Sequence, residues 1–183
     1  MLHFSRALGF SNLGETFKAE KELKSLITLR DKLSNADKSY ESGQVSVQIE
    51  AVRAWIEFSK GNSKEAIDFM KLASTLESKT SKAAVTPGEI IPAEELLGDL
   101  YIALNKPKEA LESYKLNLEV RPFRFNGIYG AAKAAEKLGD IKLAKYYFNQ
   151  LIELTSKTNS SRPEINEAKN FLTANSTSIA DNG

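Results

Sequence analysis

Apolar residues recur every three or four positions along most of the chain, which is the spacing of one face of an α-helix. In residues 141–156, for example, Ile141, Ala144, Phe148 and Leu151 fall on one helical face. No stretch of the sequence alternates between apolar and polar residues for long enough to indicate a β-strand. The pattern therefore predicts an all-α protein.

Helix start and stop signals divide this periodic sequence into separate helices. The expected helices span residues 3–13, 15–33, 38–60, 63–78, 92–104, 107–120, 124–138, 141–156 and 163–174. The last of them is expected to begin with Ser161 as its N-cap and Pro163 in its first turn. The segment 79–91 contains a Pro-Gly pair that marks a loop, and the polar residues 176–183 are expected to form a disordered tail.

Two segments of the chain align with each other at a spacing of 34 residues. The matched pairs are Gly98 with Ala132, Asn105 with Gly139, Ala110 with Ala144, and Tyr114 with Phe148. Small residues at the first and third pairs would let two helices cross closely, and the aromatic ring would fill the gap beside them. These residues resemble the pattern of the tetratricopeptide repeat, a helix–turn–helix unit of this length. The resemblance is strong over residues 91–155.

Two earlier segments show the same order of small residue, turn and small residue, with insertions between them. Their turns fall on Gly14 and Gly61, as the later turns fall on Asn105 and Gly139. Glycine and asparagine accept the left-handed conformation that follows many helix ends, so we expect it at all four positions. The resemblance implies a right-handed, tetratricopeptide-like helical solenoid of about four helix–turn–helix units and a C-terminal capping helix. One domain is expected over residues 1–175, with units at about 1–34, 38–79, 91–124 and 125–158 and a cap at 162–175.

The stretches 87–99 and 124–132 resemble the C-terminal repeats of larger, uncharacterised bacterial tetratricopeptide proteins. This resemblance implies that the chain is the end of a longer array. The first helix starts without a capping residue, and its Phe4, Leu8 and Phe10 would then form an apolar end open to contact. A further apolar cluster, at Phe123, Phe125 and Ile128, is expected in the core between units.

Charge and composition argue against several classes of function. Lys and Arg number 25 and Asp and Glu number 24, so no strong field favours nucleic acid. The sequence has no cysteine and one histidine, His3, and it lacks a Gly-rich phosphate loop, so neither an enzyme, a metal site nor a cofactor is expected. No apolar run approaches the roughly 20 residues that span a bilayer. A soluble protein of the cytoplasm or periplasm is expected.

The resemblance implies a binding protein whose groove is lined by the first helix of each unit and holds a protein or peptide. Carried over to this sequence, the groove positions are Trp55 and Phe58 in the second unit, Glu95, Asp99 and Ile102 in the third, and Asn126, Tyr129, Lys133 and Lys137 in the fourth. The lysines would meet acidic groups of the ligand, and the asparagine amide would pair with peptide backbone. Glu95 and Asp99 are acidic where domains that clamp a terminal carboxylate are basic, so such a ligand is not expected.

Three points remain open at the level of sequence. Trp55 fits either a groove anchor or the core. The chain fits an oligomerisation or domain-packing element, with homo-oligomers formed through the N-terminal helix, as an alternative to a binding adaptor. A small-molecule sensor domain is the remaining alternative, which a sealed cavity with convergent polar groups would favour over an open groove.

Overall fold

The structure is a computed structural model, and it describes residues 1–80 and 90–176. Every element of regular structure in these residues is an α-helix. The helices are α1 (Leu2–Asn12), α2 (Thr16–Asn35), α3 (Ser39–Ser59), α4 (Ser63–Lys79), α5 (Ala93–Ala103), α6 (Pro107–Val120), α7 (Phe125–Lys137), α8 (Ile141–Thr155) and α9 (Pro163–Ala174). These bounds agree with the expected ones to within two residues. Most of the expected loop at 79–91, and all but one residue of the expected tail at 176–183, lie outside the described residues.

The chain divides into two compact units, Met1–Leu100 and Tyr101–Gly183, where the sequence predicts one domain over residues 1–175. We call them the N-terminal unit and the C-terminal unit and describe each by itself. The boundary falls inside α5, whose first residues belong to the N-terminal unit.

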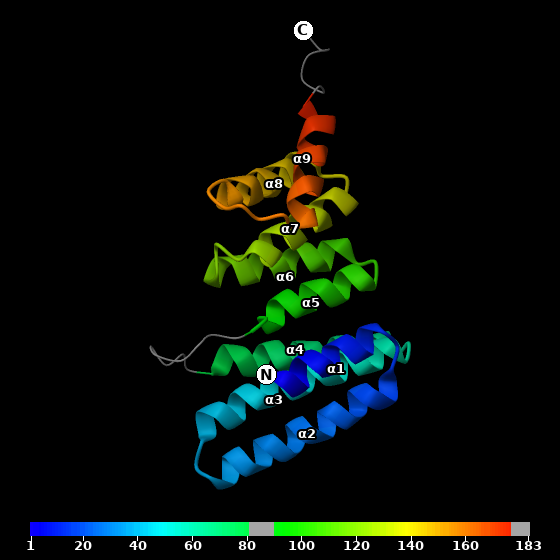
Figure 1. The fold of residues 1–183 in the computed structure, drawn as a ribbon. Helices are drawn as coiled ribbons and strands as arrows, with labels where there is room; N and C mark the ends of the chain where they lie inside the picture. The colour runs from blue at the N-terminus through cyan, green and yellow to red at the C-terminus, as the bar shows by residue number, and fades with distance from the viewer. Residues whose placement is uncertain (81–89, 177–183) are drawn as a thin grey trace. The chain divides into compact units, whose positions relative to one another are not determined.

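In the N-terminal unit, consecutive helices run antiparallel as hairpins (Figure 1). Helix α2 packs against α1 and α3, α3 packs against α4, and α1 also lies against α3. Alanines stand where these helices meet, and Ala7, Ala19, Ala54 and Ala66 have no exposed surface. A side chain of one carbon lets helix backbones approach closely, as the repeat pattern predicts.

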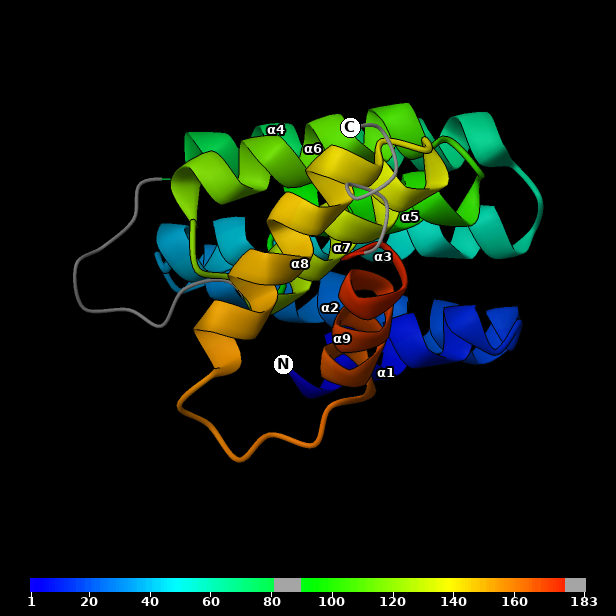
Figure 2. The same ribbon diagram turned by 90° about the horizontal axis from the view of Figure 1, so that it is seen from above.

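The C-terminal unit packs α7 against α6 and α8, and α9 against α8. In this unit the small residue Gly130 packs closely against the large ring of Tyr114. A Cβ added at Gly130 would lie 2.4 Å from that ring. Ala110 and Ala144 have no exposed surface, which confirms that small residues occupy the helix crossings. Figure 2 shows the connection between α8 and α9 looping away from the helices before it returns to α9.

The four expected turn residues all have left-handed backbones. The φ angles are +71° at Gly14, +86° at Gly61, +54° at Asn105 and +74° at Gly139. In each case the next residue's N–H donates to the carbonyl five positions back, as from Asn62 to Glu57 at 2.9 Å. This bond satisfies a carbonyl that the helix end would otherwise leave without a donor. A fifth residue, Asp37 at +55°, ends α2 in the same way and was not expected from the sequence.

These turns give a direct test of the fold in the N-terminal unit. We expect Gly61→Ala to lower the free energy of unfolding by about 1–2 kcal/mol, since an L side chain is strained in this conformation. Gly43→Ala is the matched control, because Gly43 lies inside α3 and a Cβ there meets nothing within 4 Å. It should stabilise by up to about 1 kcal/mol, because alanine is the better helix former. Urea unfolding followed by the emission of the sole tryptophan measures both; equal effects of the two changes would contradict the turn assignment.

Two expectations about individual residues are wrong. Ser161 does not cap α9: Arg162 precedes its first residue, and no side chain accepts a hydrogen bond there. The cause is Pro163, which forces the residue before it into an extended conformation with ψ of 133°. Phe123, expected in the core, is 80% exposed because it lies in the short connection between α6 and α7, whereas Ile128 is buried as expected.

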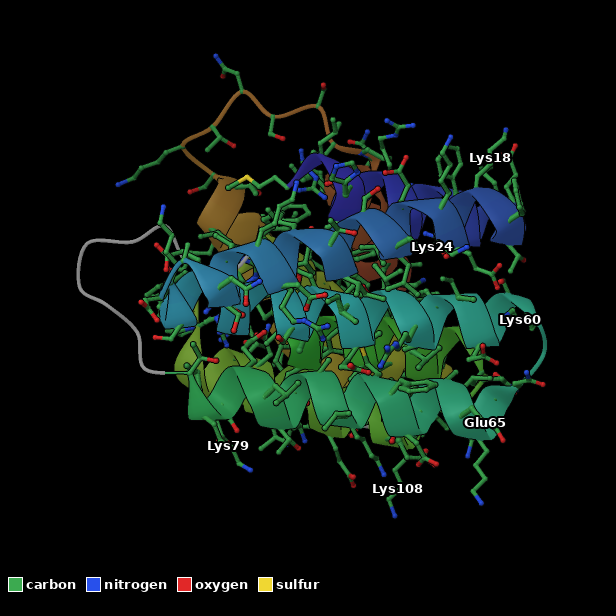
Figure 3. The ribbon with its side chains drawn as sticks, turned by 90° about the horizontal axis from the view of Figure 1, so that it is seen from below. Lys18, Lys24, Lys60, Glu65, Lys79 and Lys108 are labelled. Atoms are coloured by element: carbon green, nitrogen blue, oxygen red, sulfur yellow. The ribbon has the colours of Figure 1, made fainter. Side chains whose placement is uncertain are left out.

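Charged side chains surround this core, and a few of them join helices. Figure 3 shows Lys18 and Lys79 pointing away from the packed helices of the N-terminal unit. Lys60 at the end of α3 pairs with Glu57 at 3.1 Å and with Glu20 of α2 at 3.0 Å. Because these groups are exposed, each pair adds little to stability.

Two buried carboxylates in the same unit lie closer to their hydrogen-bond donors than these exposed pairs do. Glu22 of α2 is buried and accepts from His3 at 2.6 Å and from Arg6 at 2.8 Å, both on α1. Glu77 of α4 is buried and accepts from the backbone N–H of Ala93 at 2.6 Å. That N–H is one of the donors that the first turn of α5 leaves without a helical partner. Glu22 thus links α1 to α2, and Glu77 links the start of α5 to α4.

Candidate functional site

The N-terminal unit contains a hollow of about 440 Å³, partly open to solvent. Its walls come from α1, α3, α5 and one residue of the connection before α5. The lining residues are Phe4, Ser5, Leu8, Asn12, Trp55, Ile91, Leu96 and Asp99. Each helix involved is the first helix of a hairpin, so the hollow lies on the face where the sequence predicts a groove.

Trp55 is buried, as a core residue would be, and it also borders the hollow. Its side chain is 8% exposed, and it stands edge-on to the Phe58 ring with 5.5 Å between ring centroids. Its indole N–H is buried and has no hydrogen-bond partner. A buried donor left without an acceptor costs about 1–3 kcal/mol, so the position favours an acceptor supplied from outside the chain.

The hollow brings together two of the predicted site residues and adds others that the sequence did not single out for a site. Trp55 and Asp99 both line it, and Asp99 is exposed. Phe58 is half-buried behind Trp55 and does not line it. Most of the apolar wall comes from Phe4, Leu8, Ile91 and Leu96.

Two of those wall residues had a signal in the sequence. Phe4 and Leu8 are four positions apart on one helix face, and the sequence analysis assigned them to an apolar end open to contact. In the structure Phe4 is buried and Leu8 is half-buried, both facing the interior of the N-terminal unit. Ile91 lies in the connection before α5, where helical periodicity gives no orientation.

The C-terminal unit places three further predicted residues on one stretch of α7, and all three contact α9 or the residue before it. The Tyr129 hydroxyl donates to Glu167 at 2.5 Å. Lys133 Nζ donates to Glu167 at 2.5 Å and also to Glu136 on its own helix. Asn126 Oδ1 accepts from Arg162 at 3.0 Å, and the Arg162 guanidinium lies 3.8 Å from the centre of the Phe125 ring.

In this arrangement the predicted groove residues of α7 bind groups of the same chain. The lysine and the phenol converge on one carboxylate, as the sequence analysis expected for an acidic group of a ligand, and the asparagine side chain meets an arginine. Glu167 and Arg162 supply these groups in the described structure. Three predicted groove residues remain. Glu95, expected to line the groove, is instead buried in α5, Ile102 is half-buried near the end of α5, and Lys137 is exposed at the end of α7.

The protonation of the cluster follows from these contacts. The hydrogen bond from Lys133, and then the one from Tyr129, lower the pKa of the Glu167 carboxyl. Burial and the Glu167 carboxylate raise the pKa of the Tyr129 phenol well above its ordinary 10.0. Burial lowers the pKa of Lys133, but hydrogen bonds to Glu136 and Glu167 outweigh it and raise the value overall. All three shifts favour a charged carboxylate, a charged lysine and a neutral phenol.

The contact between α7 and α9 should therefore weaken in acid. A carboxyl whose pKa is lowered by folding contributes stability above its ordinary pKa of 4.5 and loses it as the pH falls through the lower, folded value. We expect the methyl signal of Ile165, which is buried on α9, to lose its folded position as the pH falls below 4.5. NMR from pH 7 to 2.5 measures this. Glu167→Gln should remove much of that dependence, and an unchanged acid transition in this variant would contradict it.

The described residues at the hollow and around Glu167 show no arrangement typical of a catalytic or metal-binding site. The single histidine, His3, is paired with Glu22. Within residues 1–80 and 90–176, no group of three His, Asp or Glu side chains is placed to hold a metal ion. None of the helices in that part of the chain combines the length and the apolarity needed to cross a bilayer.

The repeat assignment is supported by comparison with known families. Residues 95–123 and 127–158 each match the family model of the tetratricopeptide repeat. Two tetratricopeptide repeats therefore lie within residues 95–158. They correspond to α5 with α6 and to α7 with α8, the hairpins that the sequence pairs at a spacing of 34 residues. The fold class is confirmed: the described residues are helical throughout their regular structure and arranged as tetratricopeptide-like hairpins.

A similar fold occurs in a solved structure, the crystal structure of MamA protein. The TM-score is 0.50 with 16% sequence identity, over 85% of this chain and 91% of that chain. At this identity the likeness concerns the fold alone. No curated protein matches the sequence.

Proposed function

We propose that this protein is a binding module that holds a protein or peptide partner on the face formed by the first helices of its hairpins. Tetratricopeptide repeats generally mediate interactions between proteins, and stacked helical repeats use the surface lined by equivalent helices for binding. The proposed binding residues in the N-terminal unit are Trp55, Asp99 and, in support of the tryptophan ring, Phe58.

The observation that carries this proposal is the hollow at Trp55. It joins apolar walls, a buried donor without an acceptor and an exposed carboxylate at one place. Concave, mostly apolar sites with a few polar groups are typical of ligand binding, and tryptophan is among the residues that most often dominate the binding energy of an interface. In the C-terminal unit, taken by itself, the proposed binding residues are Asn126, Tyr129 and Lys133, which contact α9 or Arg162 in the structure. Ile102 and Lys137 are assigned to this set from the resemblance alone.

Affinity capture followed by reconstitution tests the proposal. The full chain, immobilised, is used to capture partners from an extract of its source organism, and each candidate is then purified and titrated against the free protein. We expect at least one partner to bind saturably at a fixed stoichiometry, and to bind at least tenfold more weakly to Leu8→Arg, which places a charge in the hollow. If no captured candidate binds once purified, the proposal fails.

An oligomerisation element is the second candidate function, and exposed apolar side chains near the first turn favour it. Leu13 and Phe17 are 74% and 82% exposed, and both lie where α1 turns into α2. Exposed apolar groups of this size often mark a contact surface. Sedimentation at several protein concentrations should then show a monomer–oligomer equilibrium that Phe17→Ser shifts towards monomer. A sedimentation coefficient that stays at the monomer value at every concentration would exclude this function.

A further inference from the structure

We propose that the hollow of the N-terminal unit binds one large apolar side chain of an extended peptide, and that a backbone carbonyl beside that side chain accepts a hydrogen bond from the Trp55 indole. The inference rests on the proposed function, because it names the chemistry of the ligand at the same site. It assigns the recognition to Trp55 together with the apolar side chains of Phe4, Leu8, Ile91 and Leu96.

Size and polarity of the hollow fit such a side chain. Pockets that bind drug-sized ligands commonly have volumes of roughly 300–1,000 Å³, so a hollow of about 440 Å³ has room for one large side chain together with the peptide backbone that carries it. The walls are contributed mainly by aliphatic and aromatic residues, so a ligand gains most by removing apolar surface from water there. A leucine, isoleucine, phenylalanine or tryptophan of the partner satisfies this requirement, whereas a lysine or glutamate does not.

The donor on Trp55 adds a polar requirement. The indole N–H is a donor only, and no described group of the chain accepts from it. The N–H itself has almost no exposed surface, so a group seated in the hollow reaches it when the Trp55 side chain, which lines the hollow, turns towards that group. Every residue of a peptide carries a carbonyl close to its side chain, so an extended peptide provides the apolar group and the acceptor together.

Selection from a random peptide library tests the inference and does not require a known partner. A phage library of random dodecapeptides is panned against the full chain, and selected sequences are synthesised without tryptophan and titrated in solution. Trp55 is the only tryptophan of the protein, so its emission reports directly on the hollow. We expect enrichment of large apolar residues, and a saturable change of Trp55 emission on binding.

Three variants separate the parts of the proposal. Isothermal titration calorimetry measures their binding, because Trp55→Phe leaves the protein without a tryptophan to report on it. Ser5→Phe fills the hollow from α1 and should weaken binding at least tenfold. Trp55→Phe keeps a ring but removes the donor and should weaken binding about two- to tenfold, the range that one neutral hydrogen bond gives. Thr28→Phe adds the same side chain on the exposed surface of α2, away from the hollow, and should bind as the wild type does.

Each result supports or overturns a defined claim. A library that gives no saturable binder overturns this inference. The proposed function is then tested separately, by affinity capture and reconstitution. Peptides that bind Ser5→Phe as well as the wild type, or that leave Trp55 emission unchanged, overturn the inference while the binding function stands. Trp55 emission that changes with protein concentration alone would assign the hollow to a second copy of the chain and overturn it as well. If circular dichroism shows that Ser5→Phe does not fold, the emission of Trp55 in the wild type and the affinity of Trp55→Phe still test the inference.

Discussion

Replacing Gly130 with alanine is expected to destabilise the C-terminal unit by about 1–3 kcal/mol, although alanine is the better helix former. A Cβ at this position would lie 2.4 Å from two atoms of the Tyr114 ring and 2.8 Å from a third. Tyr114 is buried in α6 and so has little room to move. Either the ring leaves its position or the backbones of α6 and α7 separate, and both reduce packing along the whole contact.

A second substitution shows whether the ring is the cause. In a Tyr114→Leu background, Gly130→Ala should cost far less, because the shorter side chain lacks the ring atoms that the new methyl would meet. The double-mutant cycle isolates this coupling. Hydrogen exchange of α7, read by mass spectrometry, measures it within the C-terminal unit. Equal costs of Gly130→Ala in both backgrounds would contradict the proposed contact.

The backbone of this fold is largely encoded in short-range patterns, and those were predictable. The turn after each first helix requires a residue that tolerates positive φ, and Gly61 and Asn105 show that glycine and asparagine mark such positions reliably. Ala110 and Ala144 mark the helix crossings for a similar reason, since only a small side chain fits there. Such requirements act on single residues, so a sequence displays them directly.

The charged contacts were not predictable in the same way. Glu167 lies on α9, a helix predicted to cap the repeats. The spacing of residues along α9 does not indicate that Glu167 faces Tyr129 and Lys133. Which charges meet depends on how two helices are rotated and shifted against each other, and this is decided by apolar packing over the whole interface. The same argument applies to Glu22, whose pairing with His3 and Arg6 joins segments some 16 to 19 positions apart.

The hollow at Trp55 shows where pattern analysis stops for the candidate site. Periodicity places Phe4 and Leu8 on one face of α1 and Trp55 on the first helix of the next hairpin. It does not show that these faces leave space between them, because a hollow is a property of how residues on three elements fit together. Ile91, from outside any helix, completes the wall and has no periodic signal at all.

Reversing the charge of Glu167 is expected to release α9 from α7. Glu167→Lys removes the acceptor of both Tyr129 and Lys133 and places a second positive charge beside Lys133. Hydrogen bonds to charged groups contribute about 1.5–3 kcal/mol when shielded from water, and we expect about 1–2 kcal/mol here, because the Glu167 side chain is 44% exposed. Amides of residues 163–174 should then exchange roughly five to thirty times faster at pH 7, since exchange follows local opening.

The control is Glu153→Lys, which makes the same change in net charge at an exposed position of α8 in the same unit. It should leave the exchange of α9 unchanged. Few apolar groups hold α9 in place: Ile165 and Ala168 are its buried residues, and Phe171 stacks on Phe148 with 4.8 Å between ring centroids. With so small an apolar contact, the Glu167 cluster should decide how firmly α9 covers the predicted groove residues of α7. Slow exchange of α9 in Glu167→Lys would instead show that apolar packing alone holds the helix, and that Tyr129 and Lys133 have no part in retaining it.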